Sequence, residues 1–505
     1  MLSVLVFAPL LAALVLLAVP RLPGRVALLI WAGTSGAVLL LVLGMWLGYD
    51  NDAVAGPSGI VGDFAYETNA TWIPSVGSRY HLGVDGLSLP LVALTAGLFF
   101  ACALYSLREQ RRPRVYAALF LFLESVSLGL FVALDLLLFF VFFDLSIVGM
   151  YFVIAGWGAG ERAARSALTF FLYTFLGSLA LLLGFLGLYV AATPHTFDLV
   201  ELARNPPLEG RPLFAGLVLA ALVVGLAVKT PTVPFHTWLP PAHTDAPAAG
   251  SAILAGVLLK MGAYGFVRIT LPLLPEAWRR FALVLVIVGV VSVLWGALVA
   301  LAQIDVKRMI AYTSVNHMGY IVLAVGAAGL VSSSDAEGQQ LAITGAVTQM
   351  VSHGLLTGAL FLLAGVLHER GGTYDMGAYG GLAVATPRFA GVFAVAAFAS
   401  LGLPGFSGFV AEFQIFTGSL GPAPVATGLA LLGILLTAGL FLAALHRIFL
   451  GESRPEQAGL RDLIAREASA IVPLLALAVL IGVLPRFLLD VIEPGASQLA
   501  GLVSR

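Results

Sequence analysis

The 505-residue sequence has very little charge. Asp, Glu, Lys and Arg together make up 10% of it, and hydrophobic residues make up 60%. Soluble domains usually carry about 25% charged residues. This composition excludes a soluble enzyme. The formal net charge of -1 also gives no basis for expecting a nucleic acid or another strongly charged partner.

The sequence is equally poor in cysteine. Cys102 is the single one, which excludes a disulfide within the chain and an iron–sulfur cluster held by its own thiolates. There is no Walker loop, zinc-ligand spacing, catalytic triad or nucleotide-binding fingerprint. We therefore expect no cofactor and no metal in this chain, and any electron carrier must belong to another polypeptide.

Long apolar segments dominate what remains. A helix needs about 20 apolar residues to cross a lipid bilayer. Fourteen such segments predict an all-α polytopic membrane protein with about 14 transmembrane helices. The first has no preceding basic region or cleavage pattern, so we expect it to be retained. The predicted ranges are 2–19, 26–48, 83–106, 115–134, 135–156, 166–192, 212–239, 247–270, 279–302, 308–330, 341–367, 387–418, 424–448 and 468–485.

Basic residues between these segments indicate an orientation. Alternate loops hold 16 Lys and Arg residues on one side and 7 on the other. Because cytoplasmic loops carry the excess of Lys and Arg, we assign the richer side to the cytoplasm. Both chain termini and the acidic loop 49–81 are then expected outside.

Two interruptions at corresponding positions suggest an internal repeat. The predicted spans 212–239 and 387–418 are over-long and contain Pro231 and Pro404, which lie 173 residues apart; the spans that begin near 115 and 279 are 164 apart. Five is an odd number of helices, so a second five-helix unit would be inverted. We expect two broken helices, and paired broken helices usually mark a transport site. The domains are then 1–114 (helices 1–3), 115–270 (first repeat), 279–448 (second, inverted repeat) and 449–505 (helix 14).

Two lysines lie deep inside these apolar spans. Lys229 flanks the first break and Lys260 is central in 247–270. A charge at the centre of a bilayer costs roughly 2.5–3.5 kcal/mol on insertion scales. A chain that keeps such charges is expected to use them, so the lysines predict a path for protons or ions.

Five further titratable residues lie at similar depth. Such groups gain or lose a proton near neutral pH once their surroundings tune them, which suits proton hopping. The alternatives are structural hydrogen bonds for the carboxylates, a capping role at the second break, and simple packing for the histidines. The candidates are Glu124, Asp144, His317, His353 and Glu412.

Asp144 and Lys229 are expected to work as a pair. A carboxylate about 4 Å from the ammonium favours the charged lysine by about 4 kcal/mol at an effective dielectric constant of about 20. Movement of Asp144 away from Lys229 would then drive a proton toward Lys260. His236 and His243 lie beside the same break, whereas Arg268 and Asp135 lie at span ends, where we expect them to reach the surface.

Six stretches resemble a known family. They are HLGVDGLSLPLV, FFVFFDLSIVGMYFVIAGWG, LTFFLYTFLGSL, KTPTVPFHTWLPPAHTDAPAAGSAILAGVLLKMGAYG, DVKRMIAYTSVNHMGY and SLGLPGFSGFVAEF. From about residue 80 to 450 the chain resembles the antiporter-like membrane subunits of respiratory complex I. Within that family the match is to subunit M of bacterial NADH:quinone oxidoreductase.

The resemblance implies fourteen helices with inverted five-helix repeats and a proton channel. Its groups would be Asp144 with Lys229, then Lys260, then Glu412 as the outward exit, with His317 and His353 between them. Glutamate at position 412 resembles subunit M, because subunits L and N usually have lysine there. The family usually has glutamate where this chain has Asp144, whose side chain is shorter by one methylene; a water molecule would then bridge it to Lys229.

The resemblance also implies partners. NADH, FMN, iron–sulfur clusters and quinone would be handled by other subunits, and L- and N-like chains would be neighbours in the bacterial cytoplasmic membrane. Two alternatives remain open. One is a subunit of a multisubunit Na+/H+ antiporter or a membrane-bound hydrogenase. The other is a scaffold bundle whose buried charges are inert.

Overall fold

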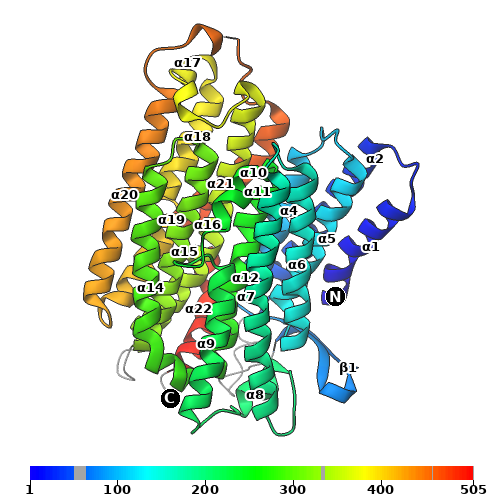
Figure 1. Ribbon diagram of the computed structural model, residues 1–505, viewed down its shortest axis with the longest axis vertical. Coiled ribbons are helices and arrows are strands. Elements are labelled where there is room, and N and C mark those ends of the chain that lie inside the picture. The colour runs from blue at the N-terminus through cyan, green and yellow to red at the C-terminus, as the bar shows by residue number, and fades with distance from the viewer. Residues whose placement is uncertain (51–63, 331–335, 458, 504–505) are drawn as a thin grey trace.

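The computed structural model describes residues 1–50, 64–330, 336–457 and 459–503, which form a bundle of long helices (Figure 1). In this part of the chain ten helices are long and apolar enough to cross a membrane. They are α2 (Gly24–Leu47), α5 (Pro113–Val132), α6 (Leu136–Trp157), α7 (Ala163–Ala191), α9 (Pro212–Lys229), the continuous helix α11–α13 (Ala248–Leu273), α14 (Pro275–Leu301), α16 (Ala336–Gly371), α20 (Pro424–Phe449) and α21 (Ala465–Val483).

Further helices complete the bundle. Three of them are also apolar: α1 (Leu2–Ala18), α4 (Leu89–Tyr105) and α18 (Pro387–Ser400). The others are α8 (Leu199–Arg204), α10 (Leu239–Asp245), α15 (Val306–Leu330), α17 (Leu382–Ala385), α19 (Ser407–Leu420) and α22 (Arg486–Val503). The chain is a helical, multi-pass membrane protein.

Two helices form the centre of the bundle. The most apolar windows of α16 and of α11–α13 are 100% buried, whereas the corresponding windows of α2, α7 and α20 are at most 39% buried. The outer helices therefore present leucine, valine and phenylalanine to lipid, and each helix satisfies its own backbone hydrogen bonds there. Charged side chains within these two buried windows can only face other protein groups.

A two-stranded hairpin was not predicted and is a small addition to an otherwise helical fold. Strands β1 (Ala65–Ile73) and β2 (Ser78–Val84) pair antiparallel, with Asn69 opposite His81. The predicted helix 83–106 consequently begins only at Leu89, because residues 78–84 belong to β2. In Figure 1 the hairpin, α8 and the C-terminus lie toward the same end of the bundle, opposite α17.

The C-terminal region differs from the prediction as well. Residues 449–505 contain α22 in addition to α21, so this region has two helices instead of one. Buried apolar residues recur along α22 with helical spacing, at Leu488, Val491, Ile492, Ala496 and Leu499. Polar residues lie between these positions, and the helix also contains Pro494. The hydrophobicity of the segment is therefore lower than that of a membrane span. Helix α22 packs against α16.

Both expected interruptions of helices are present. Helix α9 ends at Lys229 and α10 begins at Leu239, while α18 ends at Ser400 and α19 begins at Ser407. Backbone groups freed at the first interruption find partners, as they must inside a membrane. The Trp238 indole donates to the carbonyl of Val228 (3.0 Å), and the amide of Val233 donates to the hydroxyl of Ser292 (2.9 Å).

Arg268 and Asp135 do not reach the surface, contrary to the expectation. Arg268 is 8% exposed, forms an ion pair with Asp85 and lies 5.4 Å from the ring centre of Tyr264. Asp135 is 1% exposed and accepts hydrogen bonds from the first amides of α6 and from the amide of Arg79. Both residues therefore hold the end of the bundle that carries the hairpin.

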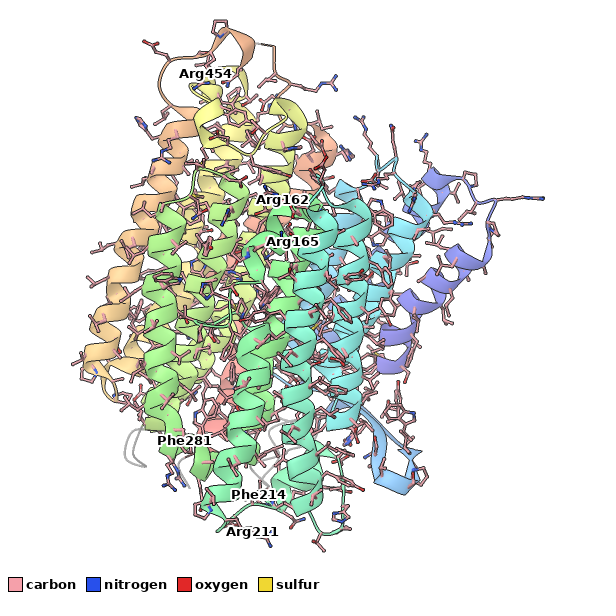
Figure 2. The ribbon with its side chains drawn as sticks, in the orientation of Figure 1. Arg162, Arg165, Arg211, Phe214, Phe281 and Arg454 are labelled. Atoms are coloured by element: carbon pink, nitrogen blue, oxygen red, sulfur yellow. The ribbon has the colours of Figure 1, made fainter. Side chains whose placement is uncertain are left out.

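Two arginines, one from each predicted side, lie at opposite ends of the molecule. Figure 2 shows Arg454 at one end and Arg211 at the other, and each was assigned to a different side. Lys307 is an exception to the loop count. It was counted as a loop residue, yet it is 1% exposed, because α15 already begins at Val306.

The attachment of the hairpin is expected to weaken as the pH rises. His81, which is buried, lies between Asp198 (Nδ1–Oδ2, 2.6 Å) and Glu67 (Nε2–Oε1, 2.7 Å). Burial lowers the pKa of His81, but the hydrogen bonds and charges of the two carboxylates outweigh burial and raise this pKa above its usual value of 6.5. A raised folded-state pKa gives stability that is complete below about pH 6.5 and is lost as the pH rises through the folded value.

Amide hydrogen exchange would measure this effect. We expect the protection factors of residues 65–84 to fall with rising pH in the wild type. In His81→Gln they should be lower and independent of pH in the same range. An identical pH dependence in both proteins would contradict the assignment to His81.

Candidate functional site

Lys229 places a buried ammonium group at the end of α9. Its side chain is 1% exposed, and Nζ donates to Ser146 Oγ on α6 (2.9 Å) and lies 4.8 Å from the ring centre of Phe143. The C-terminal end of a helix favours a positive charge. The helix ends here because Pro231 and Pro234 cannot donate backbone hydrogen bonds.

Asp144 does not contact Lys229 directly. Among the described residues no ion pair joins Lys229 to any carboxylate, and Asp144 Oδ1 has no hydrogen-bond partner. Ser146 takes the place expected for Asp144. Residues two apart on a helix point in directions about 200° apart, so Asp144 and Ser146 cannot both face Lys229. Asp144 still acts on Lys229 through its charge.

Lys260 lies in α12 (Leu259–Gly265), between π-helical stretches at Leu254–Leu258 and Phe266–Thr270. Such stretches shift the backbone hydrogen-bond pattern and often occur at functional sites. The carbonyl of Ala255, in the first stretch, accepts a hydrogen bond from Lys260 Nζ (2.5 Å). Lys260 is 0% exposed. Twelve residues separate it from the start of α11, which corresponds to a depth of about 18 Å.

Two histidines extend the series of contacts that begins at Lys260. Its Nζ lies 2.5 Å from His353 Nδ1 on α16, and the rings of His353 and His317, on α15, lie 5.3 Å apart at 77°. His317 in turn lies against the backbone of Ser400, at the end of α18. The sequence placed these three residues at similar depth, and the structure brings them into direct contact.

Glu412 lies on the other side of the second interruption, in α19. A Cβ atom added to Gly402 would lie 2.3 Å from Glu412 Oε2, and Gly402 has a positive φ of 79°. The carboxylate therefore fits because position 402 has no side chain. A hydrogen bond between Ser352 Oγ and Ser407 Oγ (2.8 Å) joins α16, next to His353, to the start of α19.

Glu124 forms its hydrogen bond away from the other candidates. It is 0% exposed on α5, and its Oε2 accepts a hydrogen bond from Ser35 on α2 (2.5 Å), while Oε1 has no partner. The two lysine-bearing helices, by contrast, touch each other. A Cβ added to Gly262, near Lys260, would lie 2.4 Å from the hydroxyl of Thr230, which follows Lys229.

Buried polar atoms without a hydrogen-bond partner lie on α16 and α19, the helices that carry His353 and Glu412. Buried polar atoms in folded proteins are normally hydrogen-bonded, to ordered water where no protein group is available. On α16 these atoms precede His353 in the chain, toward Ala336, and on α19 they follow Glu412. They are Gln339 Oε1, Thr344 Oγ1, Gln349 Oε1, Gln414 Oε1 and Ser419 Oγ.

The chemistry of this set is proton exchange. Amines, imidazoles and carboxylates can each hold or release a proton. Within residues 1–50, 64–330, 336–457 and 459–503, no three His, Cys, Asp or Glu side chains come together as a set of metal ligands.

Sequence reasoning missed Ser146 as the partner of Lys229 and missed Lys307 as a buried group. Serine gives no sequence signal in an apolar span. Lys307 does have one, because the chain has 3 lysines among its 26 basic residues and the other two were already candidates. His236 and His243 are also buried; the Trp295 indole donates to His236 (3.2 Å), whereas neither ring nitrogen of His243 has a partner.

Known proteins share this sequence and fold. Residues 133–450 match the family NADH:quinone oxidoreductase/Mrp antiporter, TM. The chain is 40% identical over 432 residues to NADH-quinone oxidoreductase subunit M of Rickettsia prowazekii (strain Madrid E), covering 85% of each protein.

Solved structures agree with this. A chain of respiratory complex I from Thermus thermophilus with bound NADH superposes with a TM-score of 0.88 and 31% identity, with 100% of both chains covered. A chain of the Mrp complex from Dietzia sp. DQ12-45-1b has a TM-score of 0.84 but 22% identity, over 100% of this chain and 99% of that one, which shows a shared fold alone. The chain belongs to the family of NADH-quinone oxidoreductase subunit M.

Proposed function

We infer that this chain translocates protons as a membrane subunit of NADH:quinone oxidoreductase, complex I. The enzyme couples NADH oxidation and quinone reduction to proton pumping, and this chain supplies a channel without a redox centre of its own. The observation that carries the proposal is the direct contact between Lys260, His353 and His317 at the buried centre of the bundle. An amine and two imidazoles in contact have no evident structural purpose among apolar helices.

The proposed route has an inner and an outer half. Asp144 controls the charge of Lys229, either through a bridging water molecule or through the electrostatic field of its carboxylate. The proton then passes from Lys229 to Lys260. His353 and His317 carry it to Glu412, from which it leaves toward the outside. The unpartnered oxygens of Gln349, Gln414 and their neighbours support hydration of this outer half. Glu124, which accepts a hydrogen bond from Ser35, would contribute a further titratable group from α5.

The proposed architecture is that of the predicted repeats. Fourteen crossings would include α9 with its extension to Leu239 and α18 with α19 as the two broken helices. Residues 115–270 and 279–448 would form the two inverted five-helix units, preceded by 1–114 and followed by 449–505. The two interruptions, each next to one of the titratable groups Lys229 and Glu412, support this assignment.

The proposed setting is the bacterial cytoplasmic membrane. L- and N-like subunits would flank the chain, and FMN, iron–sulfur clusters, NADH and quinone would be held by partner subunits. The single cysteine, Cys102, is buried, which agrees with electron transfer elsewhere. Shared fold with an Mrp chain at 22% identity does not favour the antiporter alternative.

Substitution of the lysines tests the function against the inert-scaffold alternative. In the purified enzyme reconstituted into vesicles, we expect Lys260→Met and Lys229→Ala to lose most of their proton pumping per NADH oxidised, since neither residue can then carry a proton. Asp144→Ala should lower pumping as well. Leu259→Met, a buried volume-conserving change next to Lys260 that costs less than about 1.5 kcal/mol, serves as the matched control. Near-normal pumping in Lys229→Ala and Asp144→Ala would end the proposal.

Gly402→Ala tests the position of Glu412. The left-handed conformation costs roughly 1–2 kcal/mol for a residue with a side chain, and the new methyl group would displace the Glu412 carboxylate. We expect the enzyme to assemble but to pump fewer protons per NADH. Gly428→Ala, at a helical glycine with open space around the added Cβ, should pump normally. Equal pumping by the two variants would show that the position of the carboxylate is unimportant.

A further inference from the structure

We propose that Lys307 and His243 form the proton-uptake site of this chain, between a cavity at the arginine-rich end and Lys260. This inference rests on the proposed function, because it gives Lys260 a source of protons in addition to Lys229. It adds two residues that the relay does not contain.

The choice of lysine over arginine is the first observation. The chain uses arginine for 23 of its 26 basic residues and lysine at three positions. All three lysines are at most 1% exposed. Lysine can release a proton in a buried site, whereas arginine effectively cannot. Lys307 shares this burial with Lys229 and Lys260, whereas its neighbour Arg308 is exposed.

A cavity leads to Lys307. It has a volume of about 610 Å³ and is lined by His368, Tyr374, Ala246, Glu369 and Arg466, among others. The rings of His368 and Tyr374 stack at 4.3 Å, and Lys307 Nζ lies 4.9 Å from the ring centre of Tyr374. The ammonium does not line the cavity, but it lies directly behind two residues of the cavity wall, Tyr374 and Ala246.

Lys307 also contacts the element that carries His243. Its Nζ donates to the carbonyls of Ala246 and Thr244, at the end of α10. None of the described carboxylates forms an ion pair with it, although Asp245 and Asp305 lie close enough to favour its charge. Thus Lys307 is held by two carbonyl groups and not by an ion pair.

His243 bridges the remaining distance. It is 0% exposed, both of its ring nitrogens lack a partner, and its ring stacks on Phe361 at 4.6 Å. It precedes Thr244, whose carbonyl binds Lys307. Its stacking partner Phe361 lies on α16, the helix that carries His353, the partner of Lys260. His368 and His353 are fifteen residues apart on α16, about 22 Å along the helix, so a group between them is needed.

The transfer can be written for each atom. The N–H bond of the Lys307 ammonium breaks as an N–H bond forms at a ring nitrogen of His243, directly or through water. The neutral amine then forms a new N–H bond with a proton from a hydronium ion that enters from solvent through the cavity, and a water molecule is left. His243 passes its proton on to Lys260 and returns to the neutral imidazole.

A structural role for Lys307 makes a different prediction. If it only caps the carbonyls at the end of α10, arginine should replace it, since arginine keeps the charge and the donors. If it donates protons, arginine should fail. The ring of His243 has no hydrogen bond to lose, so His243→Phe keeps the stacking on Phe361 and removes the ability to carry a proton.

The experiment measures protons pumped per NADH oxidised by the purified enzyme in vesicles, with NADH oxidation by an artificial acceptor as the check on assembly. We expect Lys307→Arg, Lys307→Met and His243→Phe to lose pumping to the same extent as Lys260→Met. Arg308→Met and His446→Phe change an exposed neighbour and an exposed histidine and should pump normally.

The outcomes separate the two proposals. Normal pumping by Lys307→Arg, or by His243→Phe, with Lys260→Met inactive would overturn the uptake site and leave the proposed function intact. Normal pumping by Lys260→Met would overturn both. If the Lys307 variants fail to assemble, His243→Phe alone decides.

Discussion

The cost of placing charge inside a membrane is the constraint on which the rest of this structure depends. Outer helices such as α2, α7 and α20 meet lipid and carry apolar side chains, and only the fully buried centre, α11–α13 and α16, can hold Lys260 and His353. The bundle solves the problem locally at each group. Lys229 lies at a helix end, Lys260 donates to a carbonyl within a π-helical stretch, and the absence of a side chain at Gly402 leaves room for Glu412. Each of these arrangements also leaves the side chain able to gain or release a proton.

The two interruptions of helices have a common physical purpose. An interrupted helix exposes unpaired backbone groups, which is tolerated inside a membrane only where protein or water can satisfy them. Both interruptions here are next to a titratable side chain, Lys229 in one case and Glu412 in the other. The interruption thus supplies polar surroundings in an apolar bundle, and the hydroxyl contact of Ser352 with Ser407 ties the second one to the central helix.

Much of this arrangement could be predicted from sequence because membrane helices obey a simple rule of length and hydrophobicity. Lys260, His353 and His317 stood out for the same reason, since titratable residues are rare in such spans. Contacts between spans could not be predicted in this way. Ser146 rather than Asp144 faces Lys229 because of the rotation of α6 about its axis, which hydrophobicity does not report. The hairpin and α22 lie outside the hydrophobic rule altogether, and Lys307 escaped notice because α15 starts two residues earlier than its apolar pattern.

The central claim is that the buried titratable groups are joined by water into one path. The most direct measurement is a structure of the intact enzyme at a resolution that shows ordered water molecules. The account predicts water contacts without a break from Lys260 and His353 past Gln349 and Gln414 to the outer face. An apolar gap between Glu412 and that face, too wide for hydrogen-bonded water to cross, would contradict it.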